Sequence, residues 1–464
     1  MAIKQIQVEV DSLVLGMYIS RLDRPWSQSP FTLQGFYLRS PREIIQLQNY
    51  CNHVFIDIQK GRAPLDSVAP PVTSSQQKNI KYQPLGRSTA RIGAKAMKKN
   101  KEQTAAAPIV VRKGFYETRT ALRKEAVQAK KIVGRLKGTL TLVVKQMGRG
   151  RTVDYGRLKE SVGDMVESVL RCPDAFTWLV RLREQDERSY DHSLRSALWA
   201  VQFARYVGMP KDEIDVLCMG TLLKDIGKAK LSNRLLRKEN RSEAEEREYR
   251  KHVTYGVDLL RQTRQIEPRV ISVVRYQTER NDGSGYPEGL AGGKIPLLAR
   301  IAGIASTYDS ICYSRDGSEP LAPSRAVGVL YGMRDKQFSD DLVVSFIQSI
   351  GLYPTGTLVE LTTGDIGVVT EQHPKSRLTP KVAVLGREDT DLTAAVIVVD
   401  LKDDEKTRDV LVGNEDKGLI DRVAIARDLE PGGYDVDLSK IAHLFITKEL
   451  GGSKGLFSGW LQRH

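Results

Sequence analysis

Hydrophobic periodicity changes twice along the chain, and each change indicates a different kind of structure. Before residue 60, IKQIQVEV alternates polar and apolar residues, LVLGMYIS is typical of a second strand, and REIIQLQNYC has helical spacing before VFIDI. Between about residues 115 and 350, apolar residues recur every three or four positions, which indicates helices. After Leu352, short strands are expected in TLVELTTG, DIGVVTEQ, PKVAVLG and AAVIVVDL.

The predicted fold class is multidomain, because 464 residues at 41% hydrophobic content suffice for about three packed units. The expected units are a small α+β N-terminal domain over 1–62, a basic linker with an amphipathic helix over 63–152, an all-α domain over 153–352, a small β module over 353–403 and a C-terminal extension over 404–464. No window of 18 apolar residues and no signal-peptide pattern occur, so we expect a cytoplasmic protein that is not an integral membrane protein. Four cysteines without a CxxC pair argue against zinc ribbons and disulfide frameworks.

The net charge of +14 is concentrated in one segment. Residues 78–151 contain 20 Lys and Arg against three acidic residues, which leaves about −3 for the rest of the chain. The apolar spacing of Leu122, Ala126, Ala129 and Ile132 predicts an amphipathic helix with a cationic outer face. A solvated tether is the favoured interpretation of this segment, and binding of nucleic acid or an anionic membrane is the alternative. Few aromatic residues interrupt the basic run, so nucleic acid is not the expected partner.

Four segments in the helical region contain the residues that could form a functional site: DERSYDHSLRSALWAVQFARYVGM, LLKDIGKAKL, KHVTYGVDLL, and VVRYQTERNDGSGYPEGLAGGKIPLLARIAGIASTYDSI. In order and spacing they resemble the HD-GYP family of cyclic-di-GMP phosphodiesterases. The resemblance implies an all-α HD-type domain with two or three iron or manganese ions, which activate a water to cleave a phosphodiester. The segments GMYISRLDRPW and LQGFYL look like a small amino-terminal domain of unknown function that precedes this module in one branch of the family.

The family's metal-ligand pattern is only partly present. His192, Asp225 and His252 match ligand positions, whereas residues of other kinds stand at four further positions, namely Lys224, Gln277, Thr278 and Ser306. Only two of the chain's six histidines lie in the helical region, so no nearby imidazole can substitute. We therefore expect no cofactor and no catalytic residue, with Asp225 and Lys228 as remnants. The alternative is one iron or manganese ion held by His192, Asp225 and His252.

The substituted centre is expected to be ion-paired, because a lone buried carboxylate is costly. Lys224, Arg188 and Asp225 are the expected ion pair or triad, and His192 and His252 are by default hydrogen-bonded core histidines. Lys228 and Arg315 match residues with which the family holds substrate phosphates, so they are the candidate nucleotide-binding residues. Both could instead be surface ion pairs.

The loop of Asp282, Gly283, Gly285, Tyr286 and Pro287 has turn-forming chemistry, and its role is either structural or that of a docking surface. Glu279 and Asp282 are expected to anchor the loop, and Tyr286 is expected to be an exposed aromatic contact. The resemblance implies that this loop contacts diguanylate cyclase (GGDEF) domains.

Three functions are compatible with these observations. The favoured one is a catalytically inactive HD-GYP protein, and so not an enzyme, that acts in bacterial cyclic-di-GMP signalling. It is expected to bind a GGDEF-type diguanylate cyclase or another signalling protein, with cyclic-di-GMP itself as a further ligand. The second is an active phosphodiesterase with an atypical single-metal site. The third is a nucleic-acid or anionic-membrane binder acting through residues 78–151.

Overall fold

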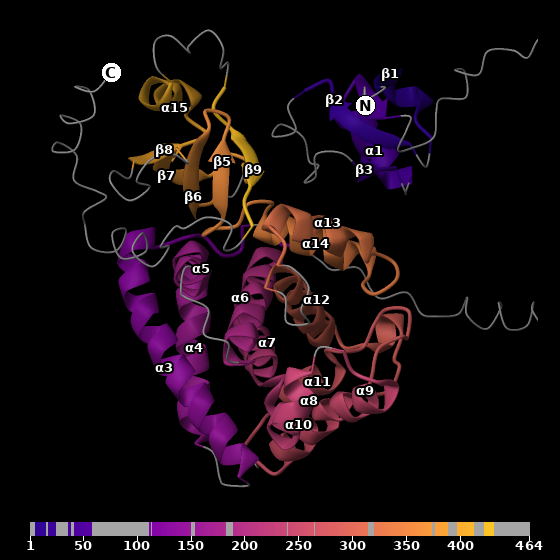
Figure 1. Cartoon of the computed structure of the whole chain (residues 1–464), viewed down its shortest axis with the longest axis vertical. Coiled ribbons are helices and arrows are strands. Elements are labelled where there is room, and N and C mark those ends of the chain that lie inside the picture. The colour runs from indigo at the N-terminus through magenta and orange to yellow at the C-terminus, as the bar shows by residue number, and fades with distance from the viewer. Residues whose placement is uncertain are drawn as a thin grey trace, which may run out of the picture. The chain divides into compact units, whose positions relative to one another are not determined.

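The structure is a computed structural model of the chain, and it forms two compact units, Met1–Gln103 and Thr104–His464 (Figure 1). It describes residues 5–14, 17–24, 36–38, 41–57, 111–112, 114–149, 154–181, 189–238, 240–263, 265–313, 320–373, 376–387, 397–412 and 422–430. Arg188, Arg315, the whole basic segment before residue 111, and residues 431–464 lie outside the described residues. The predictions for these residues therefore stay predictions.

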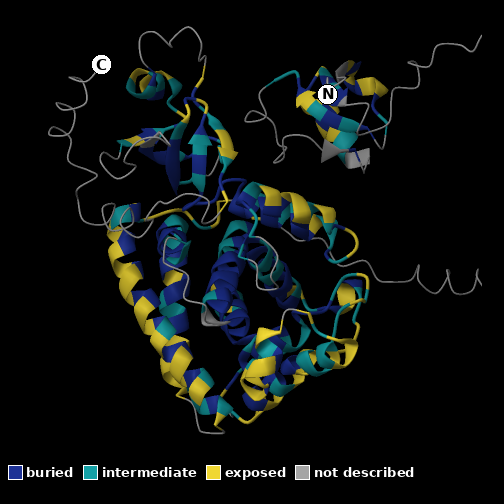
Figure 2. Cartoon of the chain, in the orientation of Figure 1, coloured by how far each residue is buried: buried dark blue, intermediate teal, exposed yellow. Residues whose placement is uncertain are grey.

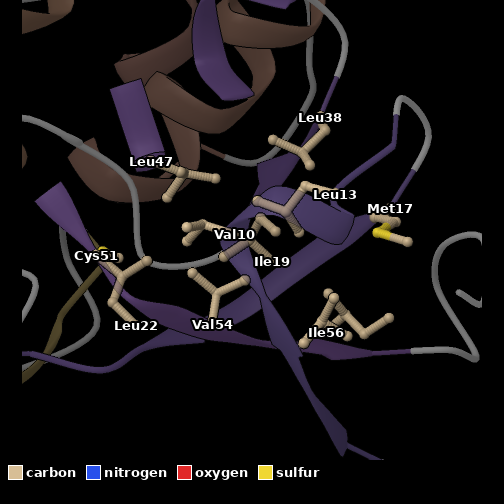
Figure 3. Packing of buried hydrophobic residues seen from close by; sticks show 11 residues of the cluster. Val10, Leu13, Met17, Ile19, Leu22, Leu38, Leu47, Cys51, Val54 and Ile56 are labelled. Carbon is tan, nitrogen blue, oxygen red and sulfur yellow. The ribbon is translucent and has the colours of Figure 1, made fainter. Parts of the chain in front are cut away.

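The first unit is a four-stranded antiparallel sheet with one helix. The sheet has the order β1-β4-β2-β3, and its elements are β1 (Gln5–Glu9), β2 (Tyr18–Leu22), β3 (Phe36–Tyr37), α1 (Pro41–Tyr50) and β4 (His53–Asp57). Alternating apolar residues turn one face of each strand inward, and Ile19, Val54 and Ile56 are fully buried with Leu47 of α1. Their side chains gather in one cluster (Figure 3). The predicted small α+β domain is confirmed.

The second unit is mostly helical, as predicted. Its longer helices are α3 (Leu122–Gly148), α4 (Tyr155–Arg171), α5 (Pro173–Arg181), α6 (Ser189–Val207), α7 (Lys211–Leu223), α10 (His252–Arg261), α11 (Pro268–Tyr276), α12 (Leu297–Cys312), α13 (Pro323–Gly332) and α14 (Asp340–Ile350), with the short α8 (Asn233–Arg237) and α9 (Glu243–Arg250) between α7 and α10. Helix α6 lies at the centre, packed on α7, α12 and α14. Its residues from His192 to Ala204 are almost all buried, so polar side chains on α6 face the interior.

Helix α3 belongs to this bundle and is not merely part of the linker over 63–152. The predicted amphipathic helix is present, and it packs against α4 and α5 along a buried stripe that includes Ala126, Ala129 and Val133. Buried Glu125 strengthens the contact, because it accepts hydrogen bonds from Ser168 and Arg171 of α4. Sequence periodicity shows that a helix has an apolar face but not which neighbour covers it.

The C-terminal sheet takes in more chain than the expected module over 353–403. The four predicted strands are β5 (Leu358–Leu361), β6 (Asp365–Glu371), β7 (Lys381–Arg387) and β8 (Ile397–Asp400), and β9 (Ile425–Asp428) adds a fifth after α15 (Asp404–Leu411). The antiparallel order is β8-β7-β6-β5-β9. Strand β9 lies at the edge of the sheet, where it pairs with β5 through its backbone and buries little side-chain surface. Its sequence, IARD, therefore lacks the apolar run by which a strand is predicted.

Polar contacts attach this sheet to the helices. Arg181 at the end of α5 donates to the carbonyl oxygens of Pro354 and Thr355 at 3.3 and 3.2 Å. Asp428 of β9 accepts from the backbone nitrogen of Ser324, at the start of α13, at 2.7 Å. Within the described part of the chain, no helix is long and apolar enough to cross a membrane.

Candidate functional site

A close backbone approach brings Asp225 and His252 together. Helix α7 ends at Leu223, and a 3-10 turn over Ile226–Lys230 follows Asp225. A side chain at Gly227 would overlap the carbonyl oxygen of His252 and the backbone nitrogen of Gly256, so this turn can lie on α10 only with glycine there. The result is a distance of 4.0 Å from His252 Nε2 to Asp225 Oδ1.

Both carboxylate oxygens of Asp225 are occupied by ammonium groups. Lys224 Nζ lies 2.5 Å from Oδ2, and Lys228 Nζ lies 2.8 Å from Oδ1. The side chains are 2%, 14% and 10% exposed for Lys224, Lys228 and Asp225. Burial alone raises the pKa of Asp225, but the two lysines outweigh it and hold that pKa well below its ordinary value. The expected pair of Lys224 and Asp225 is thus present.

Lys228 is the partner that sequence reasoning did not assign to Asp225. It was a candidate nucleotide-binding residue or surface ion pair, and here it is a largely buried ion pair. The spacing of three residues between Asp225 and Lys228 is the signal that could have indicated the contact, since residues three apart in a helical turn face one side.

His192 is fully engaged in hydrogen bonds. Its Nδ1 lies 2.7 Å from Asp309 Oδ2 and its Nε2 lies 3.2 Å from Ser306 Oγ. Burial, with Lys224 nearby, lowers the pKa of His192 to about 4, so the ring is neutral at pH 7. In that state Nδ1–H donates to Asp309 and Nε2 accepts from the Ser306 hydroxyl. The nitrogen that could bind a metal is therefore capped by a serine that stands at a ligand position of the family.

Asp309 is also held by a cation, Arg195, that sequence reasoning missed. Arg195 Nε donates to Asp309 Oδ1 at 2.8 Å, and both side chains are buried. Arg195 lies three residues after His192 on α6, so both reach the same carboxylate on α12. Arg195 offsets the free-energy cost of burying the Asp309 carboxylate, as the two lysines do for Asp225.

His252 is the first residue of α10, and the last turn of α9 orients its ring. Its Nδ1 donates to the carbonyl oxygen of Tyr249 at 2.7 Å, which leaves Nε2 facing Asp225. Burial lowers the pKa of His252 to about 4, so this ring too is neutral at pH 7. The expected reading of both histidines as hydrogen-bonded core residues agrees with this geometry.

Thr278 and Glu279 tie the GYP loop, residues 279–290, to the end of α11. The Thr278 hydroxyl donates to the carbonyl oxygen of Tyr286 at 2.7 Å. Buried Glu279 accepts from the backbone nitrogens of Glu288 and Leu290 at 2.7 and 2.9 Å. The expected anchoring role of Glu279 is therefore confirmed. Gln277 is also buried, and its carbonyl oxygen lies against Gly303 of α12.

The tip of the GYP loop depends on a side-chain turn and two glycines. Asp282 Oδ1 accepts from the backbone nitrogen of Ser284 at 2.9 Å, which confirms the anchoring role expected of Asp282. Gly283 has φ +81°, and a side chain at Gly285 would overlap the backbone of Glu279. The loop conformation therefore depends on Asp282 and the two glycines.

The expectation that Tyr286 is an exposed contact is wrong. Tyr286 is only half-exposed, its ring centroid lies 6.3 Å from that of His252, and the Arg250 guanidinium lies 5.0 Å from its centre. The bond from Thr278 pulls this part of the loop back over α10, so the aromatic ring covers the site. The exposed loop residues are Asp282, Ser284, Pro287, Glu288 and Gly289.

The residues present do not fit a metal ion. Among the described residues, no three His, Cys, Asp or Glu side chains converge on one point. Both oxygens of Asp225 are bound to ammonium groups, and Nε2 of His192 is bound to a hydroxyl. A divalent ion would have to displace Lys224 or lie beside its positive charge.

Two family profiles and several known proteins match the sequence of this chain. The profile of a domain of unknown function, DUF3391, matches residues 5–158, and that of the HD domain matches residues 180–342. The cyclic di-GMP phosphodiesterase PA4108 of Pseudomonas aeruginosa is 29% identical over 398 residues, which are 85% of this chain and 88% of that protein. The cyclic di-GMP phosphodiesterase response regulator RpfG of Xanthomonas campestris pv. campestris is 32% identical over 148 residues, or 31% of this chain and 39% of that protein.

A solved structure is also similar. Bd1817, an HDG"Y"P protein from Bdellovibrio bacteriovorus, superposes with a TM-score of 0.42 at 14% identity over 74% of this chain and 98% of that chain. The two profile matches define the class of this chain, an HD-domain protein with an N-terminal DUF3391 region. Together with the match to PA4108 and the GYP loop, they make the chain similar to proteins of the HD-GYP family.

Proposed function

We propose that this chain acts in cyclic-di-GMP signalling as an HD-GYP protein without phosphodiesterase activity, through contacts with another protein. The link to the second messenger rests on PA4108, a cyclic di-GMP phosphodiesterase that matches most of the chain. The observation that carries the loss of activity is the pairing of both Asp225 oxygens with Lys224 and Lys228. Phosphodiester cleavage in the family requires metal-activated water, and this arrangement leaves no ligand set for the ions.

The protein contact is assigned to the GYP loop. Glu279, Asp282 and Thr278 hold the loop by bonds that involve no ion, so its shape is available without catalysis. Its outward residues include Asp282, Pro287 and Glu288, and these replace Tyr286 as the proposed contacts. A GGDEF-type diguanylate cyclase is the proposed partner, on the basis of the family resemblance alone.

Binding of cyclic-di-GMP without hydrolysis is the second candidate function. Cations lie over aromatic rings beside the site: the Arg241 guanidinium is 4.0 Å from the centre of Tyr249, and Lys228 Nζ is 5.5 Å from it. Rings and cations of this kind are suited to bases and phosphates. In this candidate the working site is the buried cluster around Asp225 and His192, called the pocket below, and not the GYP loop.

Metal content and turnover test the loss of activity. We expect the purified chain, offered manganese or iron, to bind no metal stoichiometrically and to leave cyclic-di-GMP intact. The matched comparison is Lys224→His with Gln277→His, Thr278→His and Ser306→Asp, built with and without Arg188→Ala. Only the variant that also carries Arg188→Ala should gain metal. Turnover by the unmodified chain that is lost in His252→Ala would overturn the proposal.

Loop and pocket variants separate the two signalling roles. Pro287→Ser with Glu288→Ala should weaken capture of a purified GGDEF-type cyclase, whereas Lys228→Met should not. The opposite result, together with loss of cyclic-di-GMP binding in Lys228→Met, would favour the nucleotide receptor. Far-ultraviolet circular dichroism should show that each variant is folded.

A further inference from the structure

The outer face of helix α3 is cationic and free of acidic side chains. The helix contains seven basic residues and one acidic residue. That acid, Glu125, is buried and accepts from Arg171 Nη2 at 2.8 Å. Lys124, Lys131, Arg135 and Lys145 are exposed and recur at three- and four-residue steps or multiples of them, so they share one side. Figure 2 shows exposed residues along the whole length of α3.

Most of these charges are not neutralised within the unit. Arg135 is paired with Asp164 at 2.8 Å, but Lys124, Lys131 and Lys145 have no acidic partner among the described residues. Helix α9 shows the contrast: there Arg250 is paired with Glu246 at 3.1 Å, and the next residue, Lys251, with Glu248 at 2.6 Å. The face of α3 therefore carries an uncompensated positive potential over about 40 Å of helix.

The same face also offers apolar contact without aromatic rings. Val127 and Leu142 are 42% and 47% exposed, one toward each end of the helix. Between them, a Cβ atom added at Gly134 or Gly138 would have no neighbour within 4 Å beyond the adjacent residues and the backbone of the helix itself. A flat surface could thus approach the backbone in the middle while both aliphatic side chains reach into it.

We propose that this face of α3 binds the surface of an anionic phospholipid bilayer. Lipid phosphates complement the lysines, and the aliphatic side chains gain contact with the acyl boundary. Nucleic acid would use the charges but not Val127 and Leu142, and proteins that bind its bases offer aromatic rings, of which α3 has none. The proposal is independent of the pocket and of the GYP loop.

Vesicle binding by the full chain tests the charges. The probes are phosphatidylcholine vesicles with and without phosphatidylglycerol. Lys124→Gln with Lys131→Gln and Lys145→Gln should weaken binding to the anionic vesicles at least about tenfold. The control, Lys294→Gln with Lys336→Gln and Lys402→Gln, removes the same charge from exposed sites elsewhere and should bind like the unmodified chain. Equal binding by the two triple variants would overturn the proposal, because attraction would then follow net charge or the basic segment before residue 111.

A second pair of measurements distinguishes lipid from nucleic acid. Val127→Gln with Leu142→Gln should weaken vesicle binding about threefold or more while leaving any binding of a DNA duplex unchanged. Failure of the unmodified chain to bind anionic vesicles, together with tight duplex binding that the α3 lysine variant loses, would overturn the lipid assignment. Thermal unfolding checks that the exposed substitutions leave the fold intact.

Discussion

The pocket and the GYP loop of this chain differ in what holds them together. In the pocket, each residue that departs from the metal-ligand pattern is bonded to a residue that keeps it. Lys224 is paired with Asp225, and Ser306 is hydrogen-bonded to His192. In the loop, the family's residues keep a structure made of backbone bonds to Glu279 and tight glycine turns. A loop that does not use the ions for its shape can persist when the ions' ligands are replaced.

The pH dependence of stability is the largest expected effect, and it belongs to the pocket. The pKa values of His192 and His252 are lowered from 6.5 to about 4 by burial, so the unfolded chain binds more protons between these values. The stabilisation is complete above pH 6.5 and is lost as pH falls toward 4, by roughly 2 to 3 kcal/mol for each ring. Urea unfolding at several pH values measures it. His192→Gln should flatten the slope, and an unchanged slope would show that its ring is not buried as a neutral group.

Removal of the central carboxylate is expected to cost nearly as much. Asp225→Ala leaves the buried ammonium groups of Lys224 and Lys228 without their shared anion, at a cost of about 3 to 5 kcal/mol in the free energy of unfolding. Chemical denaturation at pH 7 checks this value. Lys224→Met with Lys228→Met in the same background should recover part of the loss. Stability equal to that of the unmodified chain would mean that water reaches the pocket and solvates both lysines.

The loop should respond to Glu279→Ala without a change in the pocket. This substitution removes two backbone hydrogen bonds to a buried charged group, worth about 2 to 3 kcal/mol together. Hydrogen exchange should rise at Glu288 and Leu290 while α6 and α7 stay protected. Ser284→Ala, at an exposed residue of the same loop whose hydroxyl donates to Asp282, is the control. Equal exchange in the two variants would contradict an anchoring role for Glu279.

The smallest expected effect is that of Lys224→Met. Asp225 keeps Lys228 at 2.8 Å in this variant, so the carboxylate is still paired and the cost falls to about 1 to 2 kcal/mol. A double-mutant cycle with Lys228→Met measures how the two lysines share the carboxylate. Replacing either lysine alone should lower the free energy of unfolding by less than half as much as replacing both. Strict additivity would show that each lysine acts without the other.

Local patterns predicted most of the secondary structure and part of the site. Alternation and helical spacing predicted α1, α3 and the strands β5 to β8, because side-chain direction in a strand or helix follows residue spacing. The DGSGYPEG segment predicted a loop anchored by Glu279 and Asp282 for the same local reason. The pair of Lys224 and Asp225 was also predictable, because the residues are adjacent and a buried carboxylate needs a cation.

By itself, the sequence determined the order of the modules, the residues at the ligand positions and the chemistry that their side chains can perform. Only the tertiary structure decided which partners those side chains contact. It directs Lys228 to Asp225, joins His192 to Asp309 across 117 positions of the chain, turns Tyr286 inward and adds β9 to the sheet. Spacing along a chain limits which side chains can face one way, but long-range contacts depend on how helices pack, and packing is set by all of their buried surfaces together.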